Sequence, residues 1–380
     1  MQRILISGAS ISGPALAWWL LRRGFTPTLI ERAPGPRPGG HAIDVRGAAL
    51  DVLRAMGLLE AAQDNRTRMK GVSMLDTEGK EVWRSDEMTI SGGSFGKEAI
   101  EILRDDLSNI LVSDLPAGTE IIYGDSITAL HEENDGVLVS FGQGPARKFD
   151  LVVGADGLGS NTRKLAFNTG GEVYRPFGVA LAPFSTPNML GLEDWQVSYN
   201  NGKDSCMIYT ARDNKELRAC FGFAARLEDV PADRAGQMAL VRKNCGHMGW
   251  IVPQLLDAMD EAPDFYLGPM AQVRMSHWTK GRVALVGDAG YCPSPYTGQG
   301  TSLALVGAYV LAWELAQSPG DHAAAFGRYE DKMRPYVEKN QALADLTRDE
   351  RFSDPEYYRT VIEPAMDVAK DAIELEGLRQ

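Results

Sequence analysis

The N-terminal segment contains the feature that most restricts what this chain can fold into. Residues 3–8 form a short apolar run that ends in glycine, which predicts a buried strand. A helix is predicted from Ala15 to Arg23, and a second buried strand from Pro27 to Glu31. Two strands joined by a helix in this way form a βαβ unit, in which the strands lie parallel in one sheet. The sequence therefore predicts an α/β fold built on a parallel sheet.

The turn between the first strand and the helix reads Gly8-Ala-Ser-Ile-Ser-Gly13, which is a GxGxxG pattern with Ser10 in place of the second glycine. Gly8 permits a tight turn, and Gly13 permits close packing of the helix on the strand. The free amides and positive dipole end at the start of the helix favour a pyrophosphate group. Glu31 stands where a carboxylate accepts hydrogen bonds from ribose hydroxyls. The segment predicts a dinucleotide site, of a kind that dehydrogenases and reductases also contain.

Two further apolar runs, Asp150–Gly154 and Val283–Gly287, predict strands that end in glycine. Asp156 and Asp288 follow their ends closely. Because open α/β sheets bind ligands at the carboxyl ends of their strands, three such ends predict one long ligand lying across the sheet. The segment Gly298-Gln-Gly then precedes an apolar helix, whose free N–H groups favour negative charge.

The segments Gly8–Gly13, Gly154–Arg163 and Gly287–Gly300 match GxGxxG, GADGxxSxxR and GDAxHxxxPxxGQG in order and spacing. With these three motifs the chain resembles, over essentially its full length, the class A flavoprotein monooxygenases of the para-hydroxybenzoate hydroxylase fold. The resemblance implies a Rossmann-like FAD-binding domain, an inserted β-sheet substrate domain and a C-terminal helix. It departs from the family at Ser10 and at Tyr291, where the family often has histidine, which leaves open how the loop beside the flavin is held.

Alternating residues at 72–83 and from Trp195 to Ala225 predict the inserted antiparallel sheet. Apolar residues at helical spacing predict one helix over 47–62, and a second helix is expected from about Ile100 to Leu115. We therefore expect the FAD-binding domain at 1–70, 98–170 and 270–320, and the substrate domain at 71–97 and 171–269. Residues 321–380 are expected to form a helical segment that bridges the two domains.

The resemblance assigns FAD contacts residue by residue, first to the ADP half and then towards the flavin ring. The assigned residues are Gly8, Ser10, Ile11, Ser12, Gly13, Glu31, Arg32, Arg46, Arg104, Asp156, Gly157, Gly287, Asp288, Pro295, Gly298, Gln299 and Gly300. A second dinucleotide-binding βαβ unit is missing from the sequence, which fits a family that binds NADPH or NADH only transiently.

The resemblance also implies the reaction. NAD(P)H reduces the FAD, O2 then forms a flavin C4a-hydroperoxide, and an electron-rich ring or enol takes up its distal oxygen. The protein must supply a dry cavity, so no catalytic acid, base or metal is assigned. Candidate substrate contacts are Gln196, Tyr199, Tyr209, Arg212, Phe221, Phe223 and Pro293, although the aromatic residues among them are as readily explained as core. The short length and helical tail are most similar to tetracycline-inactivating monooxygenases and polyketide hydroxylases.

Alternatives remain within this fold: an FAD-dependent reductase or saturase, a flavin halogenase, or a non-catalytic escort protein. The net charge of −12 disfavours nucleic acid as a partner. The four cysteines form no CxxC pair, and the longest apolar stretch, Leu303–Trp313, is too short to span a bilayer. We expect a cytoplasmic monomer that acts on a small polycyclic or aromatic molecule and O2.

Overall fold

The computed structural model describes residues 1–86, 88–89, 93–94, 99–349, 351 and 355–378. Its centre is a six-stranded sheet in the order β19-β20-β13-β1-β2-β9, parallel except for the edge strand β19. The strands are β1 (Arg3–Ser7), β2 (Thr26–Glu31), β9 (Glu120–Tyr123), β13 (Leu151–Gly154), β19 (Thr279–Lys280) and β20 (Val283–Leu285). The predicted α/β class and the N-terminal βαβ unit are confirmed.

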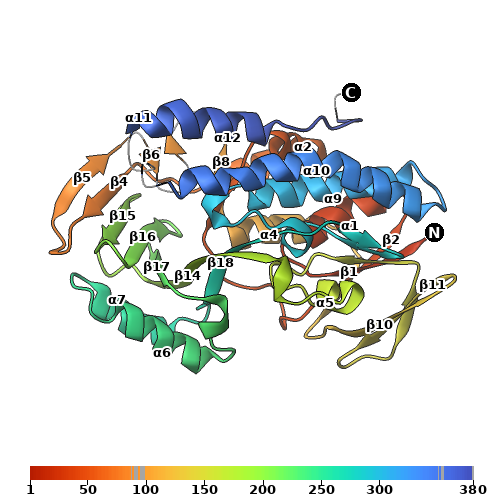
Figure 1. Cartoon of the computed structure of the whole chain (residues 1–380), viewed down its shortest axis with the longest axis horizontal. Helices are drawn as coiled ribbons and strands as arrows, with labels where there is room; N and C mark the ends of the chain where they lie inside the picture. The colour runs from red at the N-terminus through yellow and green to blue at the C-terminus, as the bar shows by residue number, and fades with distance from the viewer. Residues whose placement is uncertain (87, 90–92, 95–98, 350, 352–354, 379–380) are drawn as a thin grey trace.

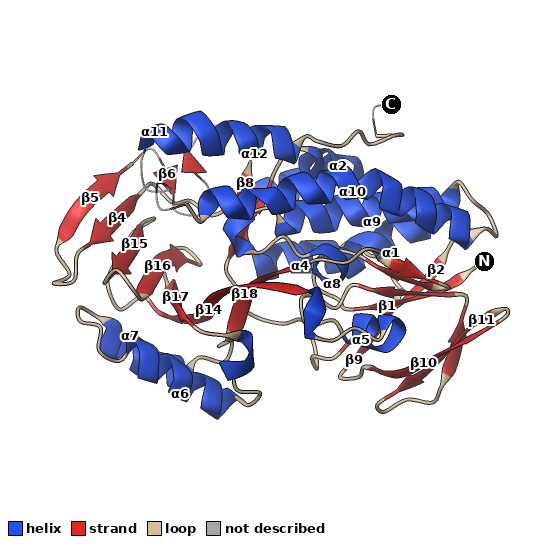
Figure 2. Ribbon diagram, in the orientation of Figure 1, coloured by secondary structure: helices blue, strands red, loops and turns tan. Residues whose placement is uncertain are grey.

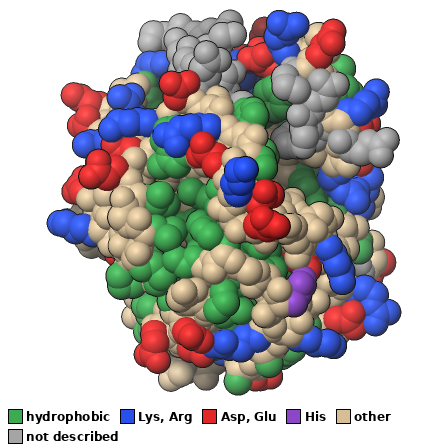
Figure 3. All heavy atoms as spheres, turned by 90° about the vertical axis from the view of Figure 1, so that its left-hand side faces the viewer, with side chains coloured by type: hydrophobic (Ala, Val, Ile, Leu, Met, Phe, Trp, Pro, Cys, Tyr) green, Lys and Arg blue, Asp and Glu red, His purple; other side chains and the backbone are tan. Residues whose placement is uncertain are grey.

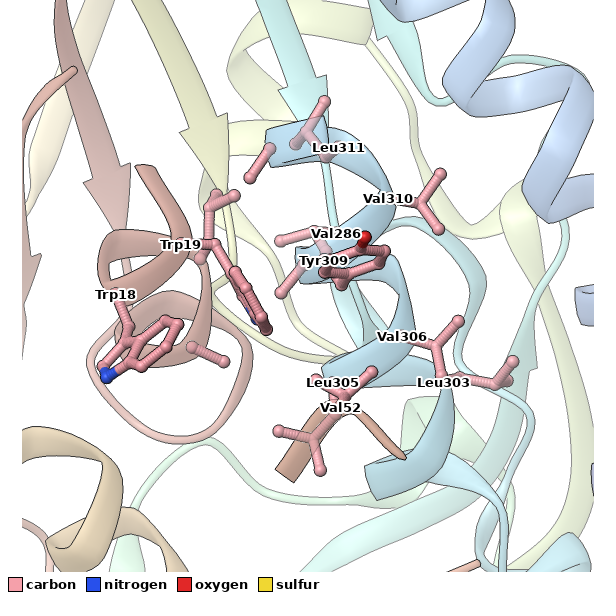
Figure 4. Packing of buried hydrophobic residues seen from close by; sticks show 14 of the residues in the cluster. Trp18, Trp19, Val52, Val286, Leu303, Leu305, Val306, Tyr309, Val310 and Leu311 are labelled. Carbon is pink, nitrogen blue, oxygen red and sulfur yellow. The ribbon is translucent and has the colours of Figure 1, made fainter. Parts of the chain in front are cut away.

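Helices cover one face of this sheet (Figures 1 and 2). They are α1 (Ser12–Arg22), α2 (Ala48–Met56), α3 (Leu59–Asp64), α4 (Arg104–Ser113), α9 (Gly300–Ala316) and α10 (His322–Thr347). Helix α9 is buried on nearly every side because α1, α2 and α10 all pack against it. Figure 4 shows Trp19 of α1 beside Tyr309 of α9, and their ring centroids lie 4.8 Å apart.

The opposite face of the parallel sheet is covered by α5 (Asn161–Phe167) and by a second, three-stranded sheet. That sheet consists of β10 (Ile127–Glu133), β11 (Gly136–Phe141) and β12 (Arg147–Phe149). Alternation along the central strands divides their side chains between the two faces: Ile4 packs towards the helices and Leu5 towards β11. The sequence analysis did not assign this layer.

A seven-stranded sheet in the order β18-β14-β17-β16-β15-β4-β5 forms the other half of the molecule. Its strands are β4 (Val72–Leu75), β5 (Glu81–Ser85), β14 (Tyr174–Pro187), β15 (Gln196–Asn200), β16 (Ser205–Ala211), β17 (Glu216–Ala224) and β18 (Gly268–Val273). Helices α6 (Arg234–Cys245) and α7 (Val252–Glu261) cover one face. The predicted meander between residues 195 and 225 is confirmed.

Two sequence-based expectations about helices were wrong in detail. The helix expected from Ile100 begins at Arg104, because residues Ile100–Leu103 form strand β8 and pair with β3 (Ala42–Val45). The helix expected over 47–62 is divided at Gly57, whose φ of +76° ends α2 in a left-handed turn.

The C-terminal part runs back over the helical layer. It contains α11 (Pro355–Tyr357), a short π-helix η5 (Tyr358–Ile362) and α12 (Glu363–Lys370). Helix α12 packs on α10, and a Cβ at Gly47 would lie 2.4 Å from the carbonyl oxygen of Lys370, so the segment reaches the start of α2. Short elements complete the description: β6 (Met88–Thr89), β7 (Gly93–Ser94), α8 (Asp288–Tyr291), η1 (Gly171–Val173), η2 (Leu227–Asp229) and η3 (Pro295–Thr297). None of the helices in the described ranges has the length and apolar character needed to cross a membrane.

Candidate cofactor and substrate site

The first glycine motif lies at the carboxyl end of β1, and two of its glycines are required by close backbone approach. Gly8 has a φ of +109°, and a Cβ there would lie 2.3 Å from the carbonyl oxygen of Ala155. A Cβ at Gly13 would lie 1.9 Å from the carbonyl oxygen of Gly8. The turn therefore brings the start of α1 close against the neighbouring strand β13, as a dinucleotide site needs.

Ser10, which replaces the second glycine, is tied to a second predicted cofactor residue. Its Oγ accepts a hydrogen bond from Arg104 at 3.2 Å, and Arg104 also donates to the carbonyl oxygen of Gly39 at 2.5 Å. Burial is the main reason why the pKa of Arg104 is lowered to about 10. Glu31 accepts from the backbone N–H of Ala9 at 3.0 Å. Ser10 therefore joins α4 to the glycine turn.

Hydrogen bonds of the middle motif connect the turn after β13 with α5 and α8. Asp156 accepts from the backbone N–H and the hydroxyl of Thr162 at 2.9 Å each, and from Ser160 at 2.5 Å. Ser160 caps α5 by accepting from the backbone N–H of Arg163. The buried guanidinium of Arg163 donates to the carbonyl oxygen of Ala289 in α8 at 2.6 Å. In this structure Asp156 thus holds the turn after β13, and Arg163 joins it to the late motif.

The late motif brings Gly287, Asp288 and Gly300 together beside α1. Gly287 has a φ of +65°, and a Cβ there would lie 2.4 Å from Ser12 Oγ. Burial raises the pKa of the Asp288 carboxyl, and its Oδ1 lies 3.7 Å from the position of a Cβ at Gly300, where α9 begins. A helix N-terminus and a carboxylate therefore lie close together at the strand ends.

The structure explains how the loop is held with Tyr291 in place of histidine. The Tyr291 ring is buried beside Trp278, with ring centroids 4.7 Å apart, and its hydroxyl bonds to that of Tyr329 at 3.0 Å. A Cβ at Gly307 would lie 2.0 Å from the Tyr291 hydroxyl. Tyr291 thus occupies space that only a glycine at position 307 leaves open.

Asp44 is a site residue that no sequence motif indicated. Its carboxyl is 5% exposed, and Oδ2 lies 3.2 Å from Arg46 and 3.3 Å from the position of a Cβ at Gly298. Burial raises the pKa of Asp44 to about 7, while Arg46 lowers it and Glu101 of β8 raises it. Tyr358 of η5 lies near the same two residues. Burial is the main reason why the pKa of Tyr358 is raised; Arg46 lowers this pKa and Asp44 raises it. Only the resemblance of the Asp-Val-Arg segment at Arg46 pointed to this part of the chain.

Several polar atoms around the strand ends are buried without a partner among the described residues. They are Nε of Arg104, Oδ1 of Asp44, Oγ of Ser294 and both amide atoms of Gln299. A buried polar atom without a hydrogen bond is costly, so native proteins rarely leave one unpaired. Their grouping along the three motifs fits a polar ligand that extends from the β1 turn to the start of α9, as FAD does. Of the other assigned residues, Gly157 has a φ of +76° and Arg32 is exposed after β2.

The seven-stranded sheet divides the predicted substrate residues between its two faces. Tyr199, Phe221 and Phe223 pack against α6 and α7, so the expectation that they line a substrate site is corrected: they are core residues. Gln196 and Tyr209 lie on the opposite face, which we call the open face. The Tyr209 hydroxyl accepts from the backbone N–H of Ala42 at 2.6 Å and so fixes the sheet to β3.

The remaining two predicted residues lie at the boundary of the sheet. Arg212 forms ion pairs with Asp105 at 2.8 Å and with Asp106 at 2.6 Å, so it fastens the β16–β17 turn to α4. Pro293 lies in the loop before η3, and its Cγ is 4.0 Å from the position of a Cβ at Gly300.

A row of side chains on the open face, which sequence reasoning did not find, runs from the sheet edge to its interior. Strand register joins Trp83, Met74, Ser198, Met207 and Cys220 in that order. Trp83 and Met74 are 41% and 40% exposed, whereas Cys220 is 5% exposed. Figure 3 views the end of the molecule to which β4 and β5 belong, and hydrophobic side chains gather in the middle of this end. The open face therefore carries a row that is apolar except for Ser198 and runs from the exposed sheet edge to the buried Cys220.

Comparison with known proteins agrees with this geometry. The FAD binding domain family matches residues 1–344. A flavin-dependent monooxygenase from an unknown prokaryotic organism is 42% identical over 348 residues, covering 90% of this chain and 88% of that protein. Two crystal structures of tetracycline destructases are similar over 99% of this chain: Tet(51), with a TM-score of 0.90, 34% identity and 100% of its own chain covered, and Tet(55), with 0.86, 37% and 98%.

A three-motif FAD site at the strand ends and a second sheet beside it define a class of flavoprotein. The chain belongs to the FAD binding domain family and is an FAD-dependent monooxygenase of class A.

Proposed function

We propose that this enzyme uses NAD(P)H and O2 to oxygenate a polycyclic molecule with an enol or phenol group, of the tetracycline or polyketide type. The likeness to Tet(51) over 99% of this chain carries the proposal, since it includes both sheets and the C-terminal helices. The row from Trp83 to Cys220 supports it, because its largely apolar side chains, with the hydroxyl of Ser198 among them, suit a flat, fused-ring molecule that carries oxygen groups. We also propose the domain division given above, with the seven-stranded sheet as the substrate-binding unit of a monomer.

The chain's own residues bind and orient the cofactor. Gly8 and Gly13 would let the α1 N-terminus approach the pyrophosphate of FAD, Glu31 would accept hydrogen bonds from its ribose hydroxyls, and Asp288 from its ribityl chain. The amides at Gly298–Gly300, at the start of α9, would hold the flavin ring and stabilise negative charge on it. When bound, FAD supplies the electron and oxygen transfer.

Water exclusion is the second task of the protein. A small apolar cluster closes one end of the open face. It consists of Phe177 of β14, Met270 of β18, Tyr296 of η3 and Ala344 of α10, and it lies beside residues Pro295–Gly300, which we call the flavin loop. Arg348 lies over the Phe177 ring at 4.5 Å and covers this cluster from outside. Excluding water from the site would favour transfer of oxygen to the substrate over release of hydrogen peroxide.

The test uses FAD-loaded protein and follows NAD(P)H oxidation with and without a tetracycline, together with the absorbance and mass of the drug. We expect oxidation to be faster with the drug and the product to be one oxygen heavier. Peroxide formation with unchanged drug would remove tetracyclines from the proposal. A product that has gained hydrogen instead of oxygen would support the alternative reductase or saturase.

A further inference from the structure

The segment Tyr291–Ser294 leads from α8 to residues Pro295–Gly300, the flavin loop, and its carbonyl oxygen at Cys292 accepts a backbone hydrogen bond from Val273 of β18 at 3.0 Å. Three successive carbonyl oxygens, those of Tyr291, Cys292 and Pro293, also accept hydrogen bonds from two buried side-chain amides. Gln341 of α10 is 3% exposed, and Gln272 of β18 is fully buried. Neither residue belongs to any of the three motifs.

Gln341 reaches the loop from the helical layer. Its Nε2 lies 3.2 Å from the carbonyl oxygens of both Tyr291 and Cys292, and 2.9 Å from that of Val273 in β18. One amide group therefore joins α10, β18 and the loop. The amide has two N–H groups for these three carbonyl oxygens, and the oxygen of Cys292 also accepts from the backbone N–H of Val273 at 3.0 Å. Replacing Gln341 would therefore leave chiefly the buried carbonyl oxygen of Tyr291 without its donor, which is costly.

Gln272 acts from the sheet side. Its Nε2 donates to the carbonyl oxygen of Pro293 at 3.1 Å and to the backbone carbonyl of Gln341 at 2.6 Å. Its Oε1 accepts from Arg274 through Nε at 3.0 Å and through a terminal nitrogen at 2.8 Å. Because arginine can only donate, it fixes the orientation of the amide so that Nε2 must face the loop.

Packing alone does not hold this loop in place. A hollow of about 260 Å3 adjoins it, and its walls include Arg274, Tyr291, Arg334 and Gln341. Tyr291 packs on Trp278 and the carbonyl oxygen of Cys292 accepts from Val273, so without the amides it is the carbonyl oxygens of Tyr291 and Pro293 that lose their donors. Any movement of this loop would displace Pro295–Gly300, which follow directly and carry the N-terminus of α9.

We propose that Gln272 and Gln341 are positioning residues. They hold the backbone of Tyr291–Pro293 in place and thereby fix the position of the flavin loop, Pro295–Gly300, relative to the bound flavin ring. Through them α10 and the seven-stranded sheet determine where Gly298–Gly300 lie relative to the cofactor. The part of this inference that concerns oxygen transfer rests on the proposed function, whereas the part that concerns the bound flavin does not.

The test compares Gln341→Leu, Gln272→Leu and the double variant with the wild type. Four quantities are measured: the Kd for FAD, the visible spectrum of the bound flavin, its midpoint potential, and the share of NAD(P)H electrons that ends in peroxide. We expect Gln341→Leu to raise the Kd for FAD about tenfold, which corresponds to about 1.4 kcal/mol, and to shift the spectrum and potential. The double variant should show less than the sum of the single effects, since both amides act on one loop.

Val139→Ala is the matched control. Val139 is fully buried in β11, in the cluster on the far face of the parallel sheet, so its truncation lowers stability without touching the loop. All variants are compared well below their unfolding midpoints. If Gln341→Leu changes the flavin spectrum, potential and Kd no more than Val139→Ala does, the proposal is overturned. Flavin effects without any oxygenated product in the wild type would uphold this inference and count against the proposed function instead.

Discussion

Tyr291 and Gly307 should depend on each other, and this dependence can be measured as a coupling energy. The perturbation is Gly307→Ala in α9, with and without Tyr291→Phe. In the wild type the new Cβ would lie 2.0 Å from the Tyr291 hydroxyl, well inside contact distance. The ring cannot easily withdraw, because it is 1% exposed and packs on Trp278.

The expected magnitudes follow from these contacts. Alanine in a helix interior is favoured over glycine by about 1 kcal/mol, whereas overpacking a core costs about 1–3 kcal/mol. Gly307→Ala alone should therefore destabilise the protein by up to about 2 kcal/mol. Tyr291→Phe removes one buried hydrogen bond, for about 0.5–1.5 kcal/mol, while Tyr329 keeps its bond to the carbonyl oxygen of Leu285 at 2.8 Å.

With phenylalanine at 291 the nearest remaining atoms would be Cζ of that ring at 3.2 Å and Cγ2 of Val286 at 3.3 Å. A Cβ then fits after a small adjustment, so Gly307→Ala should be neutral or slightly stabilising in this background. The double-mutant cycle should give a favourable coupling of about 1–2 kcal/mol.

The assay is the free energy of unfolding in urea for the four FAD-free proteins. If Gly307→Ala costs the same in both backgrounds, the Tyr291 hydroxyl does not occupy the space beside Gly307, and our explanation of how tyrosine replaces histidine is refuted.

Three further predictions concern separate parts of the site. Asp44 has a folded pKa of about 7, above its unfolded value, so its contribution to stability is complete below about pH 4 and is lost as the pH rises through 7. FAD-free wild type should therefore lose stability between about pH 4 and 7 relative to Asp44→Asn, and parallel unfolding curves for the two proteins would contradict this. Arg104→Met should weaken FAD binding about tenfold or more, measured by flavin fluorescence, because it frees Ser10 and Gly39; an unchanged Kd would show that the guanidinium does not organise the turn. Phe221→Leu should lower the free energy of unfolding by about 1–2 kcal/mol and leave the KM for the substrate unchanged. Met207→Ala on the open face should instead raise this KM. If Phe221→Leu raises the KM and Met207→Ala does not, our assignment of the two sheet faces is wrong.

The sequence predicted the cofactor half of the molecule well, for a physical reason. Gly8, Gly13 and Gly287 are read directly from the sequence because no other residue tolerates their close contacts, and strand ends are marked by apolar runs. Spacing alone therefore placed three distant segments at one edge of a sheet.

The substrate half was harder to predict. Alternation in Phe221 and Phe223 showed that they share a face, but both faces of this sheet are largely buried, so nothing local told which one the helices cover. The roles of Gln272 and Gln341 could not be predicted from the sequence. Their side chains bind carbonyl oxygens that are distant in sequence and that only the tertiary fold brings near them. Residues Ile100–Leu103 became a strand through their partner Ala42–Val45, which lies far away in sequence.

The central claim is that this chain transfers one atom of molecular oxygen to an organic substrate. The most direct measurement is a single incubation of FAD-loaded enzyme with NAD(P)H and a tetracycline under ¹⁸O2, followed by mass spectrometry of the drug. We predict one ¹⁸O atom per product molecule, with none incorporated when ¹⁸O is supplied as water instead. Oxidation of NAD(P)H that leaves every tested polycyclic enol and phenol without ¹⁸O would contradict the account.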